Sequence, residues 1–174
     1  MAASGVAEAE SEISERARME LGAVGLQDRL RSQHGKHLIF DLGAAGTVEG
    51  VLQQSGKGWA ALEHQRGQVL AVLQHVASIR GMDRYASPHA GSVRLGLASA
   101  LRSIARDRST VTVRFGGAAA GNAVDGIIDR VGSDFLELAA VPDGLARRNG
   151  NVTGVYVLPM ESVAAVLSRD TGWD

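Results

Sequence analysis

Short stretches in which large apolar residues alternate with polar or smaller ones recur along the chain. Leu38–Gly43 and Val111–Gly116 both have this alternation, which predicts strands that bury one face. In each case a glycine-rich turn and a second apolar strand follow, and that strand carries a glycine near its middle, Gly50 or Gly126. Because glycine inside a strand indicates a bulge or a close bend, we expect both second strands to turn sharply there.

These patterns belong to an internal repeat. Residues 47–63 align without a gap on residues 123–139, at an offset of 76 positions, and apolar residues, an acid and glycines recur in place. Flanking blocks match in the same order with other offsets: residues 38–43 with 111–116, and residues 70–79 with 157–166. Since the offset changes only between blocks, the insertions fall in loops, and the pattern indicates a tandem duplication.

Each repeat predicts one small β unit preceded by a helix. Leu97, Leu101 and Ile104 form one apolar face on a helix before the second repeat, as an amphipathic helix requires. A less regular helical segment, interrupted by Gly22 and Gly25, precedes the first repeat. A helix and five strongly bent strands within about seventy residues are typical of a small closed barrel of the SH3 type.

The expected fold is therefore mainly β with short helices, and consists of two tandem five-stranded small barrels, each preceded by a helix. The expected divisions are an acidic N-terminal tail or helix at 1–20, a first barrel at 21–81, a linker at 82–92, a second barrel with its leading helix at 93–169, and a C-terminal tail at 170–174.

The order of elements resembles that of the Sm-like family, which includes the LSm and Hfq-type proteins. Besides the glycine and hydrophobic pair of the second strand, the resemblance depends on Leu26-Gln27-Asp28 at the helix start. It also depends on Leu73–Ser78, which is similar to the aromatic-Lys-His-Ala-Ile-Ser signature between the last two strands. The resemblance covers most of residues 26–168 and implies two Sm-like barrels and RNA binding. Through VGSDF at 131–135 and VLPMESVAAV at 157–166, the chain is also similar to a family of short proteins from high-GC Gram-positive bacteria whose role is not established.

The chain departs from the Sm pattern at positions that would contact a base. Sm proteins place an asparagine at the start of the third strand, where this chain has Ala60 and Leu136. Arg80-Gly81 follows the final strand of the first repeat instead of lying between the last two strands. In the second repeat Glu161-Ser162 replaces the pair Gln74-His75. An RNA pocket of the family type is therefore expected in the first barrel only.

Composition narrows the class of protein. Of the 174 residues 45% are hydrophobic but only 4% are aromatic, so the core must consist of Val, Leu, Ile and Ala. The chain has no cysteine, which excludes a disulfide framework and a thiolate metal site. The formal net charge is -1, and residues 1–15 carry four glutamates and no base. No apolar run is long enough to span a bilayer and no signal-peptide pattern is present, so we expect a soluble cytoplasmic protein.

No residue pattern assembles a catalytic or metal site. His34 and His37 are three positions apart, without a third ligand nearby in the sequence. Ser55 and Ser133 are expected in turns, outside any nucleophile motif. The glycine-rich turn at 43–46 leads into a strand, whereas a phosphate loop would lead into a helix. We therefore expect a protein that is not an enzyme and has no metal and no cofactor.

Amide, imidazole and basic side chains are the candidates for nucleic-acid contact. Gln74 and His75 retain the Hfq-like signature, and histidine can stack on a base. Arg102 and Arg106 are i and i+4 on the predicted helix, where a solvated helix face is the alternative interpretation. The full candidate set is Gln74, His75, Lys57, Arg102, Arg106, Arg108, Arg147 and Arg148. RNA is the expected nucleic acid, and DNA is less favoured because no helix-turn-helix is evident.

The last two strands of each repeat predict self-association. An Sm-like barrel leaves its fourth and fifth strands with unpaired outer edges, and such edges pair with a neighbour unless they are protected. Here these strands are apolar and nearly uncharged, and the expected edge residues are Val69, Leu70, Val72, Val155, Val157 and Val163. The two barrels could pair with each other and leave two edges for a dimer or a small ring, unless the long loop at 140–154 covers an edge. The sequence thus favours a self-assembling, RNA-binding protein. A protein-interaction scaffold that has lost the RNA pocket and a DNA-binding regulator are the alternatives.

Overall fold

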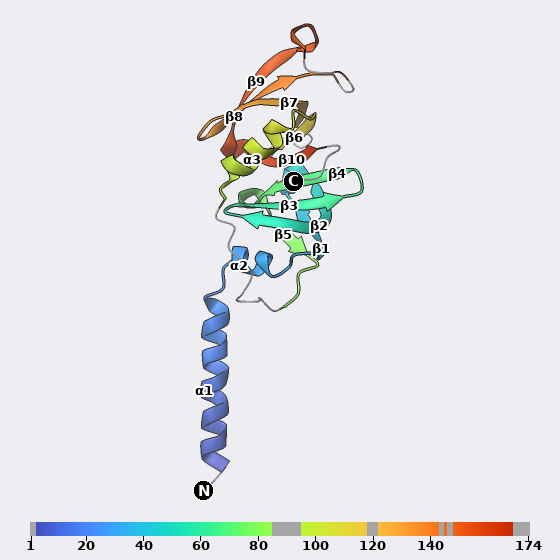
Figure 1. Cartoon of the computed structure of the whole chain (residues 1–174). Coiled ribbons are helices and arrows are strands. Elements are labelled where there is room, and N and C mark those ends of the chain that lie inside the picture. Colours follow the sequence, from blue (N-terminus) through green and yellow to red (C-terminus); the bar gives the residue numbers. More distant parts are fainter. Residues whose placement is uncertain (1–2, 85–94, 118–121, 143–144, 146–147, 169–174) are drawn as a thin grey trace.

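The computed structural model describes residues 3–84, 95–117, 122–142, 145 and 148–168 (Figure 1). The helices are α1 (Ala3–Gly22), α2 (Leu26–Arg31) and α3 (Leu97–Arg106). The strands of the first repeat are β1 (His37–Asp41), β2 (Thr47–Gly56), β3 (Trp59–His64), β4 (Gly67–Val72) and β5 (Ser78–Arg80). Those of the second repeat are β6 (Val111–Phe115), β7 (Ala123–Val131), β8 (Phe135–Ala140), β9 (Gly154–Pro159) and β10 (Val163–Ser168). Short 3-10 turns, η2 (Leu73–His75) and η4 (Met160–Ser162), follow β4 and β9.

The ten strands form one open sheet in the order β5-β1-β2-β3-β4-β10-β6-β7-β8-β9, so the prediction of a mainly β protein with short helices is confirmed. The first five strands in this order come from the first repeat and the last five from the second. We name these the first half and the second half. Strands β10, β6, β7, β8 and β9 take the places that β5, β1, β2, β3 and β4 have in the first half.

The pairing of the strands follows the offsets of the sequence repeat. In the first half Leu52 pairs with Leu62 just before the ladder shifts register. In the second half Ile128 pairs with Leu138, again just before a register shift. These two residues lie 76 positions after Leu52 and Leu62. The corresponding pairs of the flanking strands are Phe40 with Ile79 and Val113 with Val166. Both repeats therefore have the same strand register, including a bulge at the same point.

Glycine permits the close approach of strands in the middle of β2 and β7. A Cβ atom on Gly50 would lie 2.3 Å from the backbone oxygen of Glu63, and one on Gly126 would lie 2.4 Å from that of Ala139. Strand β2 pairs with β1 before this point and with β3 after it. The predicted bend therefore depends on the absence of a side chain at these two positions.

Two apolar cores cross the boundary between the halves. The core of the second half includes Leu101 of α3 and also Leu70 and Val72 of β4. The core of the first half includes Ala164 and Ala165 of β10. Each half therefore completes its core with side chains of the other half, and burial of these side chains stabilises the two halves together.

Helix α1 extends away from the sheet (Figure 1). Among its described side chains, the larger apolar ones, Val6, Ile13 and Met19, are exposed. Among the described helices none is both long and apolar enough to cross a membrane.

Candidate functional site

The two halves meet in an antiparallel ladder between β4 and β10. The paired residues are Gln68 with Ser168, Val69 with Leu167, Leu70 with Val166, and Ala71 with Ala165. Leu70 and Val166 are almost completely buried. We name this ladder and the residues that flank it the internal joint. It covers one edge of each half.

The predicted RNA contacts Gln74 and His75 lie at the internal joint. Gln74 Nε2 donates a hydrogen bond of 3.0 Å to the backbone oxygen of Glu161, and His75 Nε2 lies 2.8 Å from the same oxygen. The His75 ring also lies against Gly116, where a Cβ atom would be 2.1 Å from Nδ1. These contacts hold η2 of the first half against η4 of the second half. In this structure the pair therefore connects the two halves.

The turn between β2 and β3 also contacts the second half. The backbone N–H of Lys57 donates to the oxygen of Leu95 at 3.1 Å, and Trp59 Nε1 donates to the same oxygen at 2.9 Å. Trp59 is buried in the core of the second half. The Lys57 side chain is exposed.

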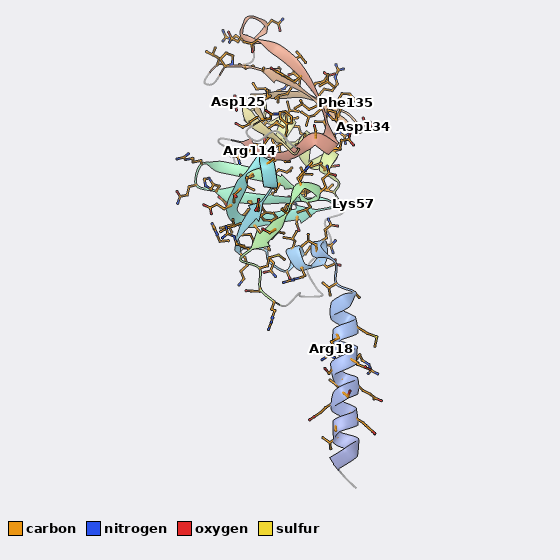
Figure 2. The ribbon with its side chains drawn as sticks, turned by 180° about the vertical axis from the view of Figure 1, so that it is seen from behind. Arg18, Lys57, Arg114, Asp125, Asp134 and Phe135 are labelled. Atoms are coloured by element: carbon orange, nitrogen blue, oxygen red, sulfur yellow. The ribbon has the colours of Figure 1, made fainter. Side chains whose placement is uncertain are left out.

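A cleft of about 600 Å³ opens beside the internal joint. Residues of β2, β3, β4, β6 and β10 line it, together with the turn between β3 and β4. Its two arginines are Arg66 in that turn and Arg114 on β6, and Glu49 is the carboxylate of the lining. Arg114 Nη1 donates across the boundary to the Thr47 oxygen at 3.3 Å, and Figure 2 shows this residue at the level where the halves meet. The lining therefore offers two guanidinium groups to a ligand.

The described residues among the other predicted nucleic-acid contacts lie outside this cleft. Arg102 donates to the Gly132 oxygen at 3.1 Å, and Arg108 forms an exposed ion pair with Asp129 at 3.2 Å. Arg106, in the last turn of α3, is exposed. Arg148 is exposed in the loop before β9, and Arg147 lies outside the described residues. The four arginines of this set that the structure describes are therefore not part of the cleft at the internal joint.

Four of the six predicted edge residues are buried within the chain: Val69, Leu70, Val72 and Val163. They face the internal joint and the two cores, so they are not available to a second copy. The other two, Val155 and Val157 of β9, are 61% and 62% exposed, and Tyr156 between them is 46% exposed. Strand β9 is the last strand of the sheet, and no strand within the described ranges pairs with its outer edge.

A further exposed apolar residue lies in α2. Gln27 of α2 and Arg102 of α3 each donate a side-chain hydrogen bond to the backbone oxygen at the end of the second strand of their repeat. Leu26 and Leu101 each precede one of these two donors in the sequence. Leu101 is fully buried in the same core as Leu70, whereas Leu26 is 48% exposed.

Reasoning from the sequence did not identify Leu26, Tyr156, Arg66 or Arg114. The repeat contains a signal for Tyr156, because the block that aligns 70–79 with 157–166 places Tyr156 opposite Val69 when it is extended by one residue. No sequence signal brings Arg66 and Arg114 together, because they lie on different halves.

The described residues offer exposed apolar side chains on β9 and two guanidinium groups in the cleft. Across the described ranges, no three histidine, aspartate or glutamate side chains gather as a metal site requires. Comparison with known proteins found no family model, no curated protein and no solved structure that matches this chain. Function is therefore inferred from the internal joint, the cleft and the outer strands of the sheet.

Proposed function

We propose that this chain is a non-catalytic assembly module, that each of its halves is an Sm-like unit, and that copies of the chain associate through the outer strands of the sheet. The observation that carries the proposal is the exposed apolar strand β9. In the same position of the first half, β4 is covered by another strand.

The Sm-like description is supported by the element order. Each half consists of a short helix and five strands, its second strand is bent near a central glycine, and a single 3-10 turn separates its last two strands. The order of strands within the sheet is also the same in the two halves. A fold of this kind can host many functions, so the function depends on the side chains of the outer strands and the cleft.

An outer strand with exposed apolar side chains favours pairing with another strand. The unpaired N–H and C=O groups of β9 can bond to a second backbone, and association would also remove Val155, Tyr156 and Val157 from water. No lysine or other charge protects the residues from Val155 to Leu158. Pro159 is at the end of the strand, beyond these residues.

Light scattering on the full chain tests this proposal. The wild-type mass should exceed that of one chain and rise with protein concentration. Val157→Lys should give a folded monomer, because pairing would bury an uncompensated charge at a cost of several kcal/mol, and each 1.4 kcal/mol weakens binding about tenfold. Ile13→Lys is the matched control, since Ile13 is equally exposed but lies on α1. A wild-type mass that stays monomeric at high concentration would refute the proposal.

Single-stranded RNA is a second candidate ligand, and the cleft at the internal joint favours it. Arg66 and Arg114 line a concave surface that also carries hydroxyl and amide side chains. Guanidinium groups bind phosphate through paired hydrogen bonds, and such contacts release counterions when RNA binds.

Binding to a labelled polyuridine should therefore weaken with salt, and replacing both cleft arginines by glutamine should reduce affinity and flatten the salt dependence by about one to two units of slope. The matched control is a second double variant in which Arg106 and Arg148, two exposed arginines outside the cleft, are replaced by glutamine. Equal losses in the control and in the double variant would assign binding to general charge. Wild-type affinity in the double variant would exclude the cleft.

A further inference from the structure

We infer that helix α1 folds back onto the second half of its own chain and pairs antiparallel with the exposed face of α3. The chain then has a closed conformation besides the extended one that Figure 1 shows. Neither self-association nor RNA binding is required for this contact. The structure supplies a hinge, two helix faces with the same spacing of residues, and opposite charges on those faces.

The connection between α1 and α2 is short and contains two glycines. Gly22 ends α1, and Gly25 comes just before α2. Among the described residues, a Cβ atom on Gly22 would meet nothing within 4 Å, and one on Gly25 would lie 3.7 Å from Asp28 Oδ2. Glycine accepts a wider range of backbone angles than other residues. The connection can therefore act as a hinge for α1.

The start of α3 lies close to this hinge. Gln27 of α2 donates a side-chain hydrogen bond to the backbone oxygen of Gly56. The next residue, Lys57, donates its backbone N–H to the oxygen of Leu95 at 3.1 Å, and Leu95 comes two positions before α3. Two hydrogen bonds thus connect the segment after the hinge with the segment before α3, so α1 can reach α3 without a long linker.

One face of α1 and the exposed face of α3 have the same spacing of residues. Intervals of four, three and four positions separate the residues in both sets, and residues at such intervals share one face of a helix. The set on α1 is Met19, Glu15, Glu12 and Glu8. The set on α3 and the segment before it is Leu95, Ser99, Arg102 and Arg106. Of these eight residues Ser99 is half-buried and the others are exposed.

Antiparallel packing brings the two sets together in a single register. The pairs are Met19 with Leu95, Glu15 with Ser99, Glu12 with Arg102, and Glu8 with Arg106. Two of the pairs combine opposite charges, and the apolar pair lies nearest the hinge. Arg102 already donates one hydrogen bond to the Gly132 oxygen, but a guanidinium group has five N–H donors and can also bind a carboxylate. The opposed helix dipoles favour the same direction of packing.

A weak contact is sufficient, because α1 is tethered. An exposed ion pair contributes little by itself, and covering Met19 and Leu95, which are 70% and 50% exposed, adds apolar burial. A short tether gives α1 an effective concentration near α3 in the millimolar range. In addition, every side chain of α1 from Gly5 to Met19 is exposed in the extended conformation, whereas most helices in proteins are stabilised by packing. Closure would supply that packing.

Closure would make α1 a strap between the two halves that responds to ionic strength. Leu95 and Ser99 line a groove of about 560 Å³ between β2, β3 and α3. A helix packed on these residues would narrow the entrance of the groove. Because salt screens exposed charges, added salt would favour the extended conformation and open the groove.

Cysteine crosslinking on the full chain tests the closed conformation, because the native chain has no cysteine. A chain with both Glu15→Cys and Ser99→Cys should form an intrachain disulfide under mild oxidation at low protein concentration. Raising the salt from about 0.1 M to about 1 M shortens the Debye length from about 10 Å to about 3 Å, so crosslinking should slow several-fold. Ile13→Cys with Ser99→Cys is the matched control. It should crosslink several-fold more slowly, since Ile13 lies two positions from Glu15 on another face of α1.

A charge exchange tests the register separately. In the chain with Glu15→Cys and Ser99→Cys, Glu8→Arg should slow crosslinking several-fold, because it places two arginines opposite each other. Adding Arg106→Glu should restore the rate, since it exchanges the two charges. Both positions are exposed, and circular dichroism checks that each variant keeps the wild-type spectrum.

A disulfide between positions 15 and 99 that forms faster than the control, and whose rate follows the charge exchange, supports the inference. Equal rates in the two cysteine pairs, or a rate that Glu8→Arg leaves unchanged, mean that α1 meets α3 without this register and overturn it. Absence of the disulfide means that α1 stays extended, and a disulfide that forms only between chains assigns the contact to a second copy. Both of these results also overturn the inference.

Discussion

Replacing Leu70 by alanine should destabilise the whole chain, although Leu70 lies on β4, the strand at the edge of the first half. Its side chain is fully buried in the core of the second half. Leu70→Ala removes three buried carbon atoms, and the loss of their burial lowers the unfolding free energy by about 2.4 kcal/mol, at about 0.8 kcal/mol per carbon. The cavity that remains raises the loss in unfolding free energy to about 3 to 4 kcal/mol. With an m-value of about 2 kcal/mol/M in urea, the unfolding midpoint should fall by about 1.5 to 2 M.

Urea titration at low protein concentration, followed by far-ultraviolet circular dichroism, measures this change in the unfolding midpoint. The matched control is Val157→Ala, because Val157 has the same place in the second half but is exposed. That variant should change the unfolding free energy by less than about 0.5 kcal/mol. The wild-type chain should unfold in one transition, because each half completes its core with residues of the other. Equal effects of the two variants, or two separate transitions, would refute this account of the internal joint.

Three further substitutions test local contacts by the same titration. His75→Ala should lower the unfolding free energy by about 1 kcal/mol, since it removes the hydrogen bond to the Glu161 oxygen. Unchanged stability would mean that His75 does not hold the two halves together and is available to contact RNA. Gly116→Ala should destabilise the wild type but cost clearly less in the His75→Ala background, because the added Cβ would otherwise meet the imidazole; additive losses would contradict the contact. Gly126→Ala should cost more than about 1 kcal/mol, because its Cβ would meet a carbonyl oxygen, whereas a Cβ on Gly154 would make only an ordinary contact with Tyr156 Cε2 at 4.0 Å; similar losses in both would contradict the bend.

Local features of the fold could be predicted from the sequence because they depend on neighbouring residues. Alternation predicted the strand that begins each repeat, and Gly50 and Gly126 predicted the bends, since both signals come from short segments. The apolar face of Leu101 and Ile104 also predicted a buried helix face correctly. Repetition of the pattern then gave corresponding positions in the two repeats.

The internal joint could not be predicted from the sequence in the same way. Pairing of the two repeats was one of two arrangements that the sequence left open, because nothing local decides which edge meets which. The roles of Gln74 and His75 depend on Glu161, which is 86 residues after His75. A signature within six residues therefore suggested an RNA contact, whereas long-range packing brings these side chains to the second half. The cleft arginines are similarly far apart in the sequence and meet only because β4 pairs with β10.

Hydrogen–deuterium exchange on the full chain tests the central claim most directly, because it reports whether the backbone of the outer strands is paired. In dilute protein, the amides of Val155–Leu158 that point away from β8 should exchange quickly, whereas those of β4 at the internal joint should exchange slowly. At concentrations where the mass rises, exchange in β9 should slow, and Val157→Lys should abolish this change. Fast exchange of β9 in an oligomer would contradict association of copies through the outer strands of the sheet.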